Sequence, residues 1–250
     1  MDYAFARTTN GRVCESFVFE FLPDTVGSII KKEALDDMDV RLYTWQLFNG
    51  LRYLQQHFIV HRDVKPVNIL LDHQKGNLKI GDFGSAKIVT KGAPSTAYQV
   101  TRFYRSPELL LGASDYSWMI DVWSAGCCVA EMMSGKVLFP GKNTKHQMKQ
   151  IITCIGVPTK KEMLHMKLHK VFNETSKIVP QTIPTRMSNV KLEMSEFVAQ
   201  ILKYSPRERL HGPKLLNHPF FDSLFKFGAK RTNGIFISSV IAKEDFQAAM

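Results

Sequence analysis

Five side chains that can do chemistry lie within eight residues of one another, between two apolar runs. The stretch FIVHRDVKPVNILLD runs from Phe58 to Asp72, and its polar centre is formed by His61, Arg62, Asp63, Lys65 and Asn68. Such groups are costly to bury without partners. Their presence between two strand-like segments therefore needs an explanation. This polar centre is therefore the candidate functional site.

A second polar position belongs to the same site. The short apolar runs NILL and LKI are joined by the polar connection DHQKGN, which predicts a β-hairpin. The start of the first strand then lies beside the end of the second, so the backbones of Asn68 and Asp82 are about 5 Å apart. Asp63, in a loop fixed by Pro66, can reach the same place. Two carboxylates and one amide favour Mg²⁺ over zinc.

The segments around these residues predict how they are positioned. SFVFEFLPDTV alternates aromatic and β-branched residues, which predicts a strand that ends at Pro23. From Asp39 onward apolar residues recur at helical spacing after a cluster of aspartates, which predicts a long helix leading to His61. YSWMIDVWSAGCCVAEMMSG is apolar on every side and stops at Gly135, which predicts a helix buried inside a helical domain.

Composition and charge limit the class of protein. The 250 residues are 44% hydrophobic, enough for one large domain or two modest ones, and the net charge is +10. Residues 1–125 carry 14 residues of each sign, so the excess lies in residues 126–250, with 19 basic against 9 acidic. A basic surface can meet nucleic acid, membrane phosphates or an acidic protein. We expect solvated lysines and no nucleic-acid partner, because no recognised binding motif accompanies the charge.

The cysteines and the N-terminus indicate the compartment. Cys14, Cys127, Cys128 and Cys154 show neither metal-ligand spacing nor a disulfide framework, which predicts a reducing compartment. The first residues lack the apolar core of a signal peptide, and no run approaches membrane-spanning length. We expect a soluble, cytoplasmic protein, with the nucleus as a second location, and no membrane partner.

Two further motifs define a resemblance. The triplets DFG at 82–84 and SPE at 106–108 follow HRD and its asparagine in the order found in eukaryotic protein kinases. Each triplet alone is weak evidence, but their shared order and spacing are specific. The stretches DVKPVNILLD, DFGSAK, YQVTRFYRSPELLLGASDYSWMIDVWSAGC and LFPG resemble the glycogen synthase kinase 3 family, and the similarity runs from the first residues to the tail. This implies an α+β, protein-kinase-like fold.

The resemblance implies a serine/threonine kinase that uses ATP and Mg²⁺. Asp63 matches the aspartate that accepts the substrate hydroxyl proton, and Lys65 matches the lysine that contacts the transferred phosphate. Asn68 and Asp82 match the metal ligands and thereby also bind the nucleotide. The catalytic residues are thus Asp63 and Lys65, and the metal ligands are Asn68 and Asp82.

The resemblance also implies an adenine site. EFLPDTV resembles the family's hinge, so backbone groups of Glu20 and Leu22 are expected to bind the adenine edge. Phe19 is expected behind the base and Leu70 beneath it. The alternative is an ordinary strand that enters a loop with apolar side chains.

Phosphate-binding residues are implied in the same way. Arg62 and Lys87 match two of the three basic residues that hold a phosphate already present on the substrate, so protein substrates, some of them pre-phosphorylated, are the expected partners. Tyr98 matches the regulatory tyrosine of the activation loop, and Arg102 and Arg105 lie near enough in sequence to bind its phosphate.

Other matches are structural, and some positions depart from the family. Glu108 and Arg209 match a buried ion pair, and Asp121 matches the aspartate that braces the catalytic loop. Val67 replaces a glutamine and Gly81 a cysteine. MLHMKLHKVF diverges from the family's partner-binding helix and loop, so binding of scaffold proteins is not expected to carry over.

The expected domain organisation is uneven. Residues 1–22 are predicted to form a remnant of the small lobe and the hinge, and residues 23–250 a complete, mainly helical large lobe with a C-terminal extension. No G-x-G-x-x-G loop and no V-A-I-K-like lysine precede Glu20. Two alternatives follow: a fragment or short isoform of an active kinase, or a non-catalytic binding module.

Overall fold

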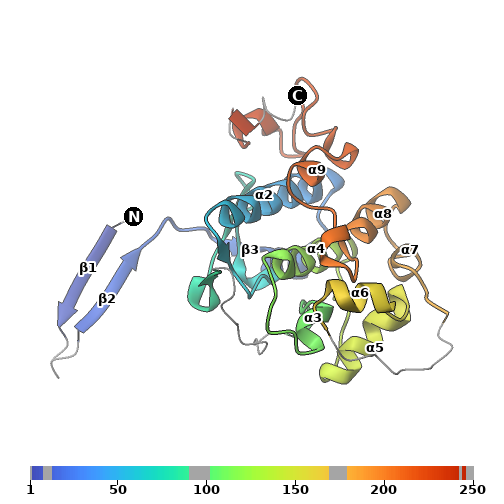
Figure 1. Ribbon diagram of the computed structural model, residues 1–250. Helices are drawn as coiled ribbons and strands as arrows, with labels where there is room; N and C mark the ends of the chain where they lie inside the picture. The colour runs from blue at the N-terminus through green and yellow to red at the C-terminus, as the bar shows by residue number, and fades with distance from the viewer. Residues whose placement is uncertain (1, 8–12, 90–101, 169–178, 242–243, 246–250) are drawn as a thin grey trace.

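The computed structural model describes residues 2–7, 13–89, 102–168, 179–241 and 244–245. Helices and short strands make one body, from which the hairpin of β1 (Asp2–Arg7) and β2 (Val13–Val18) stands away (Figure 1). The two strands are antiparallel and pair only with each other among the described strands.

Two small sheets lie within the helical body. The first has the strand order β3–β5–β6 and the second pairs β4 with β7, both antiparallel. Their bounds are β3 (Asp24–Thr25), β4 (Ile59–Val60), β5 (Ile69–Asp72), β6 (Asn77–Ile80) and β7 (Lys87–Ile88). The predicted hairpin over NILL and LKI is therefore confirmed as β5 and β6.

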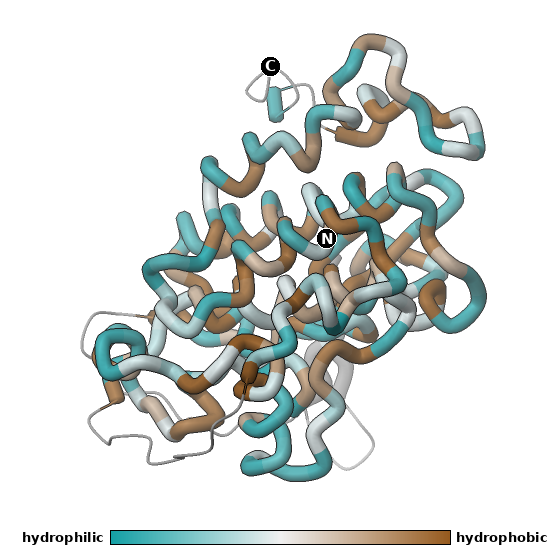
Figure 2. The backbone as a smooth tube through the Cα atoms, turned by 90° about the vertical axis from the view of Figure 1, so that its right-hand side faces the viewer, coloured by the Kyte–Doolittle hydropathy of each residue, from teal (hydrophilic) through white to brown (hydrophobic). Residues whose placement is uncertain are grey.

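Helices make most of the body. They are α1 (Val26–Lys32), α2 (Asp37–Gln56), α3 (Pro107–Leu110), α4 (Met119–Ser134), α5 (Thr144–Ile155), α6 (Lys160–His165), α7 (Ile183–Arg186), α8 (Leu192–Ile201) and α9 (Gly212–Leu216). Apolar and polar residues alternate along their turns (Figure 2), as expected for helices that bury one face. The 3₁₀ segments are η1 (Pro66–Asn68), η2 (Phe83–Ser85), η3 (Pro206–Glu208), η4 (Pro219–Phe221) and η5 (Ile237–Ser239).

Helices α2 and α4 form the centre of the core and confirm two predictions. The Asp36 side chain caps α2 by accepting a hydrogen bond from the Asp39 N–H at 2.7 Å. Helix α4 is buried along most of its length and ends at Gly135, whose φ of 70° suits glycine. The two helices pack on each other, and α2 also packs on β6, which fixes the hairpin's position.

The predicted strand before Pro23 is shorter than expected. Strand β2 ends at Val18, and residues 19–22 are not in a strand. Phe19 and Phe21 are 65% and 87% exposed, so the alternating pattern has no neighbouring surface to pack against.

Among the described residues, none of the helices combines the length and the apolar composition that crossing a membrane requires.

Candidate active site

The loop between β4 and β5 is held by one buried carboxylate. Asp121, in the first turn of α4, accepts hydrogen bonds from the backbone N–H groups of His61 at 2.7 Å and Arg62 at 2.9 Å. The bracing role expected for Asp121 is confirmed by these contacts. Burial raises the pKa of Asp121 to about 6, while the two N–H groups act in the opposite direction by stabilising the ionised form.

Three side chains meet in the middle of this loop. The Lys65 ammonium lies 2.7 Å from Oδ2 of Asp63. The Asn68 side-chain amide donates to the Asp63 carbonyl oxygen at 2.9 Å and to Asp63 Oδ2 at 3.2 Å. Pro66 opens the 3₁₀ turn that brings Asn68 back toward Asp63. The predicted proximity of Asp63 and Asn68 is thus confirmed.

The hairpin register brings Asp82 to the same end of the sheet. Ile69 lies opposite Ile80, and the Gly81 N–H donates to the Asn68 carbonyl oxygen at 2.8 Å. Asp82 is the next residue, so its nearness to Asn68 is confirmed for the backbone. Asp82 has a φ of 57°, and its Oδ1 accepts from the Gly84 N–H at 3.3 Å. This bond caps η2 and helps hold the left-handed conformation.

The side-chain oxygen atoms of Asn68 and Asp82 suit a Mg²⁺ ion that has few protein ligands. Among the described residues, no group of three or more His, Cys, Asp or Glu side chains is placed to hold a metal ion. Mg²⁺ typically takes one or two protein ligands and completes its shell with water and substrate phosphates. The Asn68 amide directs its N–H groups to Asp63, which leaves its oxygen for a cation. Asn68 and Asp82 therefore fit such a site.

The predicted adenine residues lie around the same sheet. Glu20 forms an exposed ion pair with Lys79 of β6 at 3.3 Å, and Leu22 is half-buried. Strand β3 follows at once and places Thr25 opposite Leu70. The hinge segment thus runs beside the strand that carries Leu70, and its role in adenine binding stays a prediction.

The glycine before DFG has a visible structural consequence. A Cβ atom at Gly81 would lie 2.9 Å from Leu70 Cδ1. Leu70 therefore packs directly against the backbone in the place where a larger residue would project. Val67, the other departure from the family, is exposed and presents an apolar group to solvent.

The first pair of predicted phosphate-binding residues occupies neighbouring positions. Lys87 lies on β7 opposite Val60, two residues before Arg62. The Arg62 guanidinium donates to the Ser85 carbonyl oxygen at 2.6 Å. The backbone of Arg62 has a φ of 69°, in the left-handed region. Phosphate binding by Arg62 and Lys87 stays a prediction.

The second set of predicted phosphate-binding residues follows Tyr98 in the sequence. Tyr98 lies outside the described residues. Arg102 donates from Nε to the Gly141 carbonyl oxygen at 3.2 Å, and Arg105 follows three residues later. Binding of a Tyr98 phosphate by these two arginines stays a prediction.

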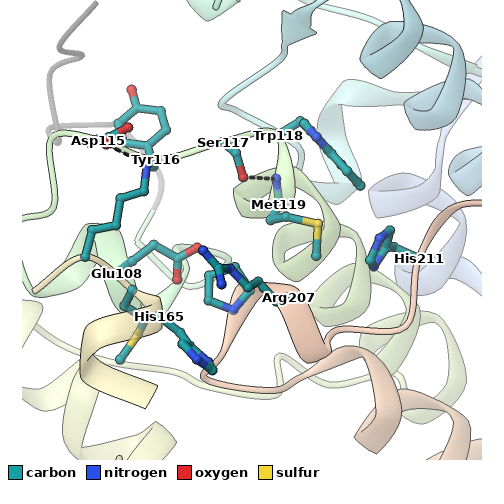
Figure 3. A pocket seen from close by; sticks show the side chains of 12 residues that line it. Glu108, Asp115, Tyr116, Ser117, Trp118, Met119, His165, Arg207 and His211 are labelled. Carbon is teal, nitrogen blue, oxygen red and sulfur yellow. Dashed lines mark hydrogen bonds and ion pairs between the residues drawn. The ribbon is translucent and has the colours of Figure 1, made fainter. Parts of the chain in front are cut away.

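The predicted pair of Glu108 and Arg209 is confirmed, and it lies beside a pocket. The Arg209 guanidinium contacts both Glu108 carboxylate oxygens, at 2.8 and 2.7 Å. The pocket, of about 370 Å³, lies between α6, η3 and the segment before α4 (Figure 3). Its side chains include Trp118, His165 and His211. Sequence reasoning missed this pocket because its walls come from segments far apart in the chain.

The loop, the hairpin and the buried ion pair are arranged as the protein kinase resemblance predicts. Residues 4–221 match the protein kinase domain family, and the chain belongs to that family. It is 39% identical over 215 residues to "Protein kinase gsk3" of Schizosaccharomyces pombe, covering 84% of this chain and 56% of that protein. It is also 39% identical over 214 residues to "Glycogen synthase kinase 1" of Pyricularia oryzae, covering 84% and 54%.

The family match confirms the predicted α+β protein kinase fold, and the two relatives agree with the resemblance to the glycogen synthase kinase 3 family. The chain spans a little over half the length of the two relatives.

Proposed function

We propose that the chain is an ATP-dependent protein serine/threonine kinase of the glycogen synthase kinase 3 type. The observation that carries the proposal is the contact of Asp63 with both Lys65 and Asn68 at the end of the β5–β6 hairpin. Lys65 and Asn68 both engage Oδ2, so Oδ1 of Asp63 is the oxygen that accepts the proton of a substrate hydroxyl. Lys65 lies beside it, where it can stabilise charge on the transferred phosphoryl group.

Mg²⁺ and the ATP phosphates would bind beside Asp63, next to Asn68 and Asp82. Asn68 and Asp82 would hold the ion through their amide and carboxylate oxygens. The bound ion supplies neutralisation of the phosphate charge. The hinge residues Glu20 and Leu22 bind the adenine edge, with Leu70 beneath it. This arrangement orients the hydroxyl and the phosphate for in-line transfer.

The partners in this proposal are protein substrates, including pre-phosphorylated ones bound through Arg62 and Lys87. The cytoplasm is the proposed location, with the nucleus second. Free Cys127, Cys128 and Cys154, all buried, support a reducing compartment.

A second candidate function is a binding module that engages phosphorylated proteins without catalysis. It is supported by the position of Lys87 opposite Val60, two residues before Arg62, because two neighbouring basic residues can bind a phosphate without any catalytic step.

Phosphotransfer to serine/threonine peptides separates the two candidates. Asp63→Asn keeps the shape of the side chain and removes the proton acceptor, so the rate should fall by at least about 100-fold. Asp115→Asn, which changes an exposed carboxylate paired with Lys167, is the matched control and should keep the parent rate. Equal rates for Asp63→Asn and the parent would refute the catalytic assignment. Phosphopeptide binding without any transfer would favour the binding module.

A further inference from the structure

Helix α5 and the residue before its N-cap present a row of lysines to solvent. Lys142, Lys145 and Lys149 are all exposed, and none forms an ion pair with a carboxylate of the described residues. We call these three residues the α5 lysine stripe. The opposite face of the helix is buried in the core and fixes which side faces outward.

The stripe is unfavourable for the helix that carries it. Residues 142–155 contain no acidic residue, and the first turn of α5 contains none either. Lys142 and Lys145 lie at the N-terminal end, where the helix dipole favours negative charge. Lys145 and Lys149 are four residues apart, so their like charges repel. No ion pair among the described residues offsets this unfavourable charge, whereas a bound anionic segment would offset it.

The helix is tied to the segment that follows the activation loop. Gln147 is fully buried; its Oε1 accepts from the Gly141 N–H at 2.9 Å and its amide donates to the Phe103 carbonyl oxygen at 3.1 Å. Arg102 donates to the Gly141 carbonyl oxygen from the other side. Helix α5 also packs against α3, which begins directly after Ser106. The stripe is therefore held in a fixed position next to residues 102–106.

We propose that the α5 lysine stripe binds an aspartate- and glutamate-rich segment of the protein substrate. This inference rests on the proposed kinase function, because residues 102–105 lie between the activation loop and the SPE triplet. Lys145 and Lys149 are about 6 Å apart along the helix axis. Alternate side chains of an extended peptide repeat at about 6.6 Å, so carboxylates at every second residue match the lysines. Charge complementarity of this kind favours fast encounter and orients the partner.

Fluorescence anisotropy without nucleotide tests the proposal independently of catalysis. The probe is a labelled serine peptide with glutamate at every second position, and the reference probe replaces each glutamate with glutamine. The parent chain should bind the acidic probe at least tenfold more tightly than the reference, and added salt should weaken this binding. Equal binding of the two probes, or no binding of either, would overturn the proposal.

Charge reversal locates the binding surface. Lys145→Glu together with Lys149→Glu should weaken binding of the acidic probe at least tenfold. The matched control is Lys203→Glu together with Lys214→Glu, two exposed lysines without described ion pairs, the second on α9 at the other end of the body (Figure 1). The control should change affinity less than twofold. If the charge-reversed variant does not fold, Lys145→Ala together with Lys149→Ala tests the same surface. This variant should weaken binding of the acidic probe at least threefold.

Three outcomes separate this inference from its alternatives. If a single-stranded oligonucleotide bound through the stripe more tightly than the acidic peptide, the partner would be nucleic acid and the proposal would be wrong. If the acidic peptide binds through the stripe but no phosphotransfer occurs, the docking surface stands and the proposed catalysis fails. If phosphotransfer occurs but the charge reversal does not change peptide binding, the proposed catalysis stands and the proposed docking surface is wrong.

Discussion

Replacement of Glu108 by alanine should destabilise the fold strongly. The side chains of Arg209 and Glu108 are 0% and 3% exposed. The five N–H groups of Arg209 meet five acceptor contacts, two on Glu108 and one each on the carbonyl oxygens of Met119, Lys203 and Tyr204. Glu108→Ala removes the only carboxylate among these contacts and leaves a buried, uncompensated charge. Breaking such a pair costs about 3–5 kcal/mol.

Thermal unfolding measures this cost. For a chain of this size each kcal/mol lowers the Tm by about 2–4 °C, so Glu108→Ala should lower it by about 6–20 °C. Asp115→Ala breaks the neighbouring ion pair with Lys167, whose side chains are 73% and 53% exposed. Exposed pairs contribute about 1 kcal/mol at most, so this control should shift the Tm by less than about 4 °C. Similar shifts for the two variants would refute the reasoning from burial.

Three further predictions concern other contacts within the fold. Gly81→Cys should lower stability by about 0.5–1.5 kcal/mol in a denaturant titration, because its Cβ would push the half-buried Leu70 side chain away from its rotamer, and unchanged stability would contradict that contact. Arg231→Ala should leave the buried Asp39 carboxylate unpaired and speed proteolysis within residues 229–241; an unchanged cleavage rate would count against this. The pKa of Asp121 is raised on folding, so its contribution to stability is present below pH 3.8 and is lost as the pH rises through about 6. The stability of Asp121→Asn relative to the parent should therefore improve by up to about 3 kcal/mol between pH 4 and pH 7, and a constant difference would refute the burial argument.

Local patterns made the site predictable from the sequence. The hairpin and the return of Asn68 toward Asp63 depend on contacts between residues close in the chain, where strand pairing and a proline turn limit the possibilities. Helices α2 and α4 were predictable because their apolar periodicity and their ends agree.

Long-range contacts were not predictable in this way. Arg231 forms a buried ion pair with Asp39 across 192 residues, and no local pattern marks either residue as a partner of the other. The early end of β2 also depended on tertiary context, because the alternation through Phe21 is that of a strand but no surface covers it. The pocket lined by Trp118, His165 and His211 was also not predictable, because its walls come from segments far apart in the chain.

Thermal unfolding with added MgATP tests most directly whether the chain holds a nucleotide at Asn68 and Asp82. With ATP at about ten times its dissociation constant, binding should stabilise the protein by about 1.4 kcal/mol, which raises the Tm by about 3–6 °C. The rise should disappear in Asp82→Ala and when EDTA removes Mg²⁺, and it should persist in Asp115→Ala. No rise at any ATP concentration, or an equal rise in Asp82→Ala, would contradict the assignment of this hairpin end as the MgATP site.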